Sequence, residues 1–214
     1  MQAIRSATLD PHLSVRQLLK GYTAQLHDKL DSSPALSSLL KPALTLSDYS
    51  RTLTGFALAY ESLEGDYGSL ETMLGLGQVP AYTPRLPALI HDLDALDQRT
   101  NLSRSVQVLD QKRCRIHSEW QYWGSRYVLE GATQGSKIIA SQLLKHLPQL
   151  VPHAFAFWEL QLHLAQQWTV LCTHMAQSAP KGDAKQQLLD GAHIAFDTFS
   201  NCFALIRGNG ENNV

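Results

Sequence analysis

Residues 127–139 read YVLEGATQGSKII and place two glycines, Gly131 and Gly135, four positions apart in a run that otherwise predicts an α-helix. A glycine inside a helix costs about 1 kcal/mol relative to alanine, so the pair needs a reason. Residues four positions apart lie on one helix face. The bare face could admit another helix at close range, or it could clear space for a flat ligand against the backbone. The residues alone leave both interpretations open.

The rest of the chain repeats the helical period rather than the alternation of strands. Apolar residues recur three or four positions apart in residues 15–30, 49–63, 86–96, 116–147, 158–176 and 188–206, which predicts six helices. We expect Ser47 to cap the second helix, and residues 65–84, rich in glycine and proline, to form a loop with one short helical turn. The sequence therefore predicts an all-α fold with a single domain over residues 1–214 and flexible ends near residues 1–10 and 208–214.

Composition excludes several classes of partner. The net charge is −1 and the sequence pI is about 6.7, so the chain lacks the basic footprint of proteins that bind nucleic acid or anionic membranes. No window approaches the roughly 18 uninterrupted apolar residues of a membrane span. The three cysteines, Cys114, Cys172 and Cys202, are sparse and widely spaced, which argues against a disulfide framework and predicts a reducing, cytoplasmic setting.

The glycine-bearing stretch resembles the distal-helix signature of bacterial heme oxygenases, in which a Tyr-Val-x-Glu-Gly-Ser-x-x-Gly run is typical. Alanine replaces the usual serine at Ala132. The positions that match are Tyr127, Val128, Glu130, Gly131 and Gly135. Residues 48–64 and 84–96 also resemble the family's second long helix and its Arg-x-x-x-Leu-x-x-Asp-Leu stretch. The resemblance follows the family's order along most of the chain and implies the family's multi-helix fold.

Residues 18–31, LLKGYTAQLHDKLD, resemble the proximal helix of the same family, which reads Leu-Arg-x-x-Thr-x-x-x-His-x-x-Leu. Lysine replaces the arginine at Lys20, and the other matching positions are Leu19, Thr23, His27 and Leu30. The resemblance implies that His27 is the proximal iron ligand and that Lys20 contacts a heme propionate. His27 is one of nine histidines, and without the resemblance nothing separates it from a surface histidine.

The spacing along this helix suits those roles. Arg16, Lys20, Thr23 and His27 are offset by 4, 3 and 4 positions, so they share one helix face. Lys20 precedes His27 by seven residues, roughly 10 Å along the axis at 1.5 Å per residue. The propionates of heme lie about that far from its iron. The face can therefore offer an imidazole to the iron and cations to the carboxylates, and we expect Arg16, Lys20 and Thr23 to contact the heme.

On the distal side the resemblance implies that Gly131 and Gly135 leave room for bound O₂ and ordered water. It also implies that Tyr127, one turn before Gly131, touches the heme edge. Phe199 and Phe203 in the last predicted helix are expected to line the pocket, because the family's last helix packs near the heme edge. The acid of the motif, residue 130, is expected to be structural and bonded to a neighbouring helix.

Two departures from the family pattern leave roles unassigned. Ala132 stands where some members have an aspartate that holds distal waters. Between residues 146 and 180 the chain has no lysine or arginine, although the family often supplies a propionate contact there. Arg16, Arg126 or Lys185 could substitute, and the sequence does not choose among them.

The resemblance implies a heme oxygenase that turns heme, O₂ and electrons into biliverdin, CO and Fe²⁺. Since the dinucleotide fingerprint GxGxxG is absent, the electrons must come from a separate donor, of the ferredoxin or flavoprotein reductase type. A heme carrier or sensor on the same fold, without ring-cleaving activity, is the alternative, whereas His27 in its motif argues against a relative that binds no heme. The sequence leaves open which meso carbon is cleaved and whether the product serves iron supply or a bilin-binding photoreceptor.

Overall fold

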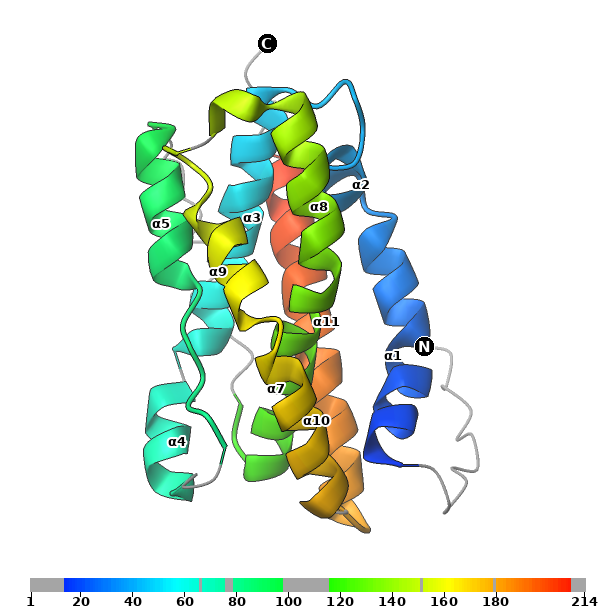
Figure 1. Cartoon of the computed structure of the whole chain (residues 1–214). Coiled ribbons are helices and arrows are strands. Elements are labelled where there is room, and N and C mark those ends of the chain that lie inside the picture. The colour runs from blue at the N-terminus through cyan, green and yellow to red at the C-terminus, as the bar shows by residue number, and fades with distance from the viewer. Residues whose placement is uncertain are drawn as a thin grey trace.

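The computed structural model describes residues 14–65, 67–75, 79–97, 116–150, 152–178 and 180–208. Within these residues every regular element is a helix and no strand occurs, which confirms the all-α prediction (Figure 1). The flexible ends expected near residues 1–10 and 208–214 lie outside the described residues, apart from Gly208, which ends the last helix. Among the described helices, none combines the length with the hydropathy that a membrane crossing requires.

The helices fall into two groups along the chain. The first group is α1 Val15–Asp31, α2 Pro34–Ser38, α3 Leu46–Glu64, α4 Tyr67–Leu74 and α5 Leu86–Ala95. The second group is α7 Glu119–Gly131, α8 Thr133–His146, the 3₁₀ helix η2 Pro148–Leu150, α9 Ala156–Leu164, α10 Gln167–Ser178 and α11 Asp183–Gly208. Figure 1 shows α11 running lengthwise through the molecule, and α7, α3 and α1 all pack on it.

Reciprocal hydrogen bonds at the first turn define where two of the long helices begin. In α1 the side chain of Ser14 accepts the amide of Gln17, and the Gln17 side chain accepts the amide of Ser14. In α3 the same exchange joins Thr45 and Asp48. Such capping boxes satisfy amides that a helix start leaves unpaired. The expectation that Ser47 caps α3 is wrong, because Thr45 holds that position.

The helix expected over residues 116–147 is two helices, because the chain bends at Ala132 between α7 and α8. The hydroxyl of Thr133 donates to the carbonyl of Glu130 over 2.6 Å, and the hydroxyl of Ser136 donates to the carbonyl of Ala132 over 3.2 Å. Hydroxyls bonded to the preceding turn in this way often bend helices. The bend lies between the two glycines of the motif.

A second bend divides the helix expected over residues 158–176 into α9 and α10. The side-chain amide of Gln134 donates to the carbonyl of Ala165 over 3.0 Å. A carbonyl that a continuous helix would use is therefore bonded to α8 instead, and the contact ties α8 to the turn between α9 and α10. The sequence prediction also missed α2 and reduced the eight-residue α4 to a single turn.

A close crossing between α7 and α11 is made by two other glycines. A Cβ atom added at Gly124 would overlap the backbone carbonyl of Leu188, and one added at Gly191 would overlap the backbone of Gln121. The two helices therefore meet backbone to backbone. This is the packing role that the sequence left open for Gly131 and Gly135.

Replacing Gly124 with alanine is expected to lower the free energy of unfolding by about 1–3 kcal/mol or more. The obstacle is backbone, which cannot turn aside as a flexible side chain can. Urea unfolding measures the change. Gly21→Ala in α1 is the matched control, because nothing lies within 4 Å of its added Cβ and helix propensity favours it by up to about 1 kcal/mol. Equal stability of the Gly124 variant and the wild type would contradict the described crossing.

Candidate functional site

One face of α1 carries the predicted residues beside the apolar stripe of the helix. Arg16, Lys20 and His27 are all exposed on this face, whereas the stripe next to it is buried, and α1 packs on α11 and α10. Thr23 lies at the edge of this face and is buried, and its hydroxyl donates to the Leu19 carbonyl over 2.8 Å. The shared face expected from the spacing is therefore present, but the Thr23 hydroxyl is already used within the helix.

His27 is oriented by a carboxylate on its own helix. Its Nδ1 lies 3.2 Å from the Oδ2 of Asp31, one turn further on, and its side chain is 62% exposed. Its ring also meets the edge of Phe196 from α11, with ring centroids 6.3 Å apart. When Nδ1 carries the proton and donates to the carboxylate, Nε2 keeps its lone pair. Among the described residues no hydrogen bond or ion pair engages that Nε2, so its lone pair can serve a ligand.

The two motif glycines have different surroundings. A Cβ added at Gly131 would lie 3.3 Å from the ring of Trp168 in α10, whereas nothing lies within 4 Å of one added at Gly135. On the same face of α8 as Gly135, the side chain of Ile138 is 64% exposed. Gly131 thus accommodates a packed aromatic ring. Gly135 borders open space beside an exposed apolar side chain, which is the arrangement that a flat apolar ligand needs.

Arg16 from α1 approaches the end of α7. Burial raises the pKa of Tyr127 to about 12, the nearby Cys172 thiol adds to the rise, and Arg16 opposes it. Arg16 likewise opposes the rise that burial causes in the pKa of Cys172. The Tyr127 ring packs on Trp168, with centroids 4.8 Å apart. The structure therefore brings together a cation and a phenol that the sequence assigned separately to the heme edge.

Arg126, the second candidate for a propionate contact, is ruled out by its surroundings. Its side chain is 1% exposed, and its guanidinium contacts the carboxylates of Glu130 and Glu71 and the carbonyl of Pro80. Lys185, the third candidate, lies in the first turns of α11 and is partly exposed. Of the three, Arg16 is exposed and near enough to Tyr127 to oppose the rise in the pKa of that phenol.

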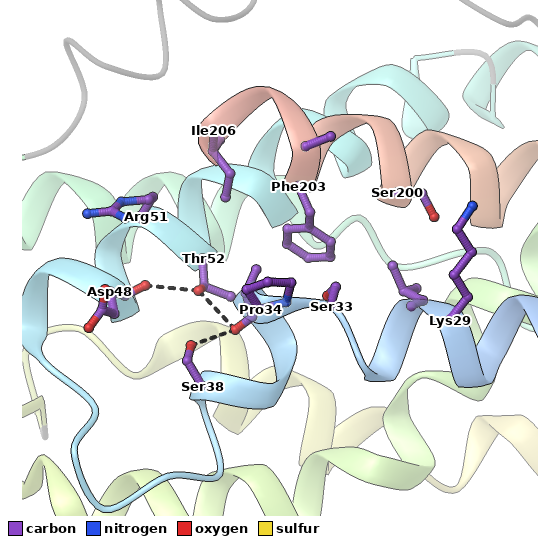
Figure 2. A pocket seen from close by; sticks show the side chains of 13 residues that line it. Lys29, Ser33, Pro34, Ser38, Asp48, Arg51, Thr52, Ser200, Phe203 and Ile206 are labelled. Carbon is purple, nitrogen blue, oxygen red and sulfur yellow. Dashed lines mark hydrogen bonds between the residues drawn. The ribbon is translucent and has the colours of Figure 1, made fainter. Parts of the chain in front are cut away.

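The two α11 phenylalanines that were expected to line the pocket, Phe199 and Phe203, have different surroundings. Phe199 is buried in the core with its ring against Tyr60 and Phe56, so its position gives no support to the expectation that it lines a heme pocket. Phe203 lines an open groove of about 640 Å³ between α11, α2 and the facing ends of α1 and α3 (Figure 2). None of the thirteen described residues lining this groove is a His, Cys, Met or Tyr, the side chains that ligate heme iron.

Two contacts of the site, those of Asp31 with His27 and of Trp168 with Gly131, were not predicted from the sequence. Asp31 could have been found, because it lies one turn after His27 on the same face of a confidently predicted helix. Trp168 could not, since its contact with Gly131 depends on the packing of α10 against α7. Glu130 is structural as expected, and it accepts hydrogen bonds from Arg85 just before α5 and from Arg126.

The arrangement can be compared with known proteins. A family model described as heme oxygenase matches residues 13–204. This chain belongs to the heme oxygenase family. A heme oxygenase from Xanthomonas campestris pv. campestris strain 8004 is 30% identical over 162 residues, which cover 76% of this chain and 88% of that protein. The solved structure of heme oxygenase from Leptospira interrogans is 18% identical and shares the fold, with a TM-score of 0.62 over 90% of this chain and 99% of that chain.

The residues of this heme oxygenase fit the heme that its family acts on. An exposed imidazole has its Nδ1 engaged by Asp31, which suits an iron ligand. Gly135 and Ile138 offer a bare, apolar helix face. Arg16 and Lys20 supply cations on the α1 face that carries His27.

Proposed function

We propose that this heme oxygenase cleaves heme with O₂ and electrons from a separate donor, and that it releases biliverdin, CO and Fe²⁺. The observation that carries the proposal is the contrast between the two glycines, because the face at Gly135 stays open while Gly131 is filled by Trp168. When bound, heme supplies both the iron at which O₂ is activated and the carbon that is oxidised.

His27 is the proposed iron ligand through Nε2. The carboxylate of Asp31 holds the ring by accepting a hydrogen bond from Nδ1–H, which leaves Nε2 as the ligating nitrogen. Phe196 limits rotation of the ring from the α11 side. These contacts prepare one nitrogen of one histidine, whereas a free surface imidazole would sample many orientations.

Arg16 and Lys20 are the proposed partners of the heme carboxylates. Both are exposed on the face that carries His27, and they precede it by eleven and seven residues. A planar guanidinium can pair with a carboxylate through two parallel hydrogen bonds, whereas an ammonium acts as a point charge. Tyr127 lies near Arg16 and would border the same end of the ligand.

The face of α8 would present no side chain at Gly135 to one side of the heme, and it would shield that side from bulk water. Gly135 leaves the backbone accessible, and Ile138 presents apolar surface that a bound macrocycle would cover. Ala132 is exposed at the bend and carries no group that could hold water. Room beside the ligand, rather than an acid at position 132, is therefore the contribution of this helix.

A turnover assay tests the proposed reaction. The heme complex is incubated in air with ascorbate, or with ferredoxin and its reductase, and the absorption spectrum is followed. Loss of the heme bands with growth of a bilin spectrum, and capture of CO by a reduced globin, are expected. A parallel sample without O₂ should keep its heme. Heme that stays intact after full reduction in air would favour the carrier or sensor instead.

A further inference from the structure

The residue immediately before the first motif glycine belongs to a fully buried ion pair. The Oε2 of Glu130 lies 2.9 Å from Nη2 of Arg85, and both side chains are 0% exposed. The other carboxylate oxygen, Oε1, lies 3.4 Å from Nε of Arg126, which is one turn earlier on α7. Each oxygen of this carboxylate therefore serves a different guanidinium.

Arg85 connects this pair to a different part of the fold. Its backbone amide donates to the Oε1 of Glu64 at the end of α3 over 2.6 Å. Its guanidinium lies over the ring of Tyr82, 4.3 Å from the centroid, and donates to the carbonyl of Thr83. The last turn of α7 is thereby tied to α3 and to the segment that leads into α5.

A buried ion pair contributes little net stability relative to apolar side chains of the same size, because both charges lose their hydration. Such a pair instead fixes the relative positions of its groups, since two donor groups must meet two oxygens. The ion pair lies next to the bend, because the backbone carbonyl of Glu130 accepts a hydrogen bond from the hydroxyl of Thr133. At the next residue, Gly131, the ring of Trp168 from α10 lies against the helix. Contacts from two other parts of the fold therefore meet at the last turn of α7.

We infer that Glu130, through Arg85, is a positioning residue that sets the bend between α7 and α8 and so sets where Gly135 stands over the heme. It touches neither the heme nor the open face, because its carboxylate is buried among the two arginines. Its effect on heme chemistry rests on the proposed function, whereas its effect on the bend belongs to the protein alone.

The test compares two variants in which a glutamate that bonds to side chains of α7 is replaced by the isosteric glutamine. Glu130→Gln presents an amide NH₂ to one of two donor-only guanidinium groups, so one hydrogen bond must break. Glu71→Gln is the matched control. The amide of Tyr82, the hydroxyl of Tyr122 and Arg126 all approach a single oxygen, Oε1, of Glu71, which the glutamine oxygen can replace. Both variants change a carboxylate to an amide in one network, but only Glu130 adjoins the bend.

Amide hydrogen exchange of the heme-free proteins is the first measurement. Glu130→Gln should speed exchange of residues 131–136 by about tenfold relative to amides of α3, whereas Glu71→Gln should leave that ratio unchanged. If Glu130→Gln does not fold, Arg85→Lys replaces it, because lysine keeps the charge and loses the planar fork. Exchange that rises uniformly, or not at all, at the bend would overturn the inference whether or not the protein cleaves heme.

The ferrous CO complex gives a second, spectroscopic measurement. A shifted or broadened C–O stretching band is expected for Glu130→Gln and not for Glu71→Gln, because the band senses the surface that faces the ligand. With turnover established for the wild type, kcat should fall roughly ten- to hundredfold while KM changes little. An unaltered band and an unaltered kcat, in a variant whose exchange is faster at the bend, would overturn the link to Gly135.

Discussion

Replacing His27 with alanine is expected to lower bilin formation by at least about a hundredfold and to change the ferric heme spectrum. The variant removes the imidazole on α1 that is oriented by a carboxylate. The remaining Asp31 has only oxygen atoms and cannot supply a neutral nitrogen ligand. The His27 side chain is mostly exposed, so the heme-free variant should unfold at nearly the wild-type temperature. Heme titration, the ferric spectrum and the turnover assay measure these effects.

A second histidine offers a control, because it also pairs with a carboxylate four residues later, although through Nε2 rather than Nδ1. His193 on α11 lies 3.1 Å from the carboxylate of Asp197, four residues later, and is partly exposed. His193→Ala should keep the spectrum and the rate, since its ring packs on Tyr22, which lies on a different side of α1 from His27. A His27 variant with an unchanged ferric spectrum and normal turnover would assign the iron to another ligand.

Replacing Gly135 with leucine is expected to abolish most turnover while the heme-free protein keeps or gains stability. Nothing lies within 4 Å of an added Cβ, so the side chain extends into the open space assigned to heme and O₂. Gly135 lies in the first turn of α8, where leucine is favoured over glycine by up to about 1 kcal/mol. A ligand displaced by even about 1 Å can lose roughly a hundredfold in rate. Thermal melts of the heme-free protein and the turnover assay measure the two effects separately.

Gly131→Leu is the informative comparison for that variant. Its Cβ would meet the ring of Trp168 at 3.3 Å, and overpacking of this kind costs about 1–3 kcal/mol. The leucine at position 131 should therefore lower the melting temperature, and the leucine at position 135 should not. A Gly135 variant that melts much earlier yet makes bilin at the normal rate would assign that glycine to packing as well.

Local patterns were enough to predict the long helices. The start and end of α1 follow from its apolar period and from the Ser14–Gln17 capping box, both of which involve neighbours in sequence. The bend at Ala132 was not predicted. The local hydroxyl bonds of Thr133 and Ser136 favour a bend, but the contacts of Trp168 and Arg85 next to it come from other parts of the fold. Sequence spacing predicts only which residues share a helix face, and tertiary contacts decide what packs against that face.

The same distinction explains the candidate site. His27 and Lys20 follow from spacing within one helix and a family resemblance, so their shared face could be stated in advance. The different surroundings of Gly131 and Gly135 could not be predicted without knowing where α10 packs. The choice of Arg16 over Arg126 needed burial, since both are arginines near a motif in the sequence and only Arg126 is enclosed by carboxylates.

The central place of α11 has a consequence for the order in which the protein can fold during synthesis. The helices α1, α3 and α7 all pack on α11, which is the last of the described helices to be translated. At roughly 5–20 residues per second, the apolar faces of the three earlier helices wait several seconds for their common partner. Nascent chains that stop before residue 183 would expose these faces together and depend on chaperones to stay unaggregated.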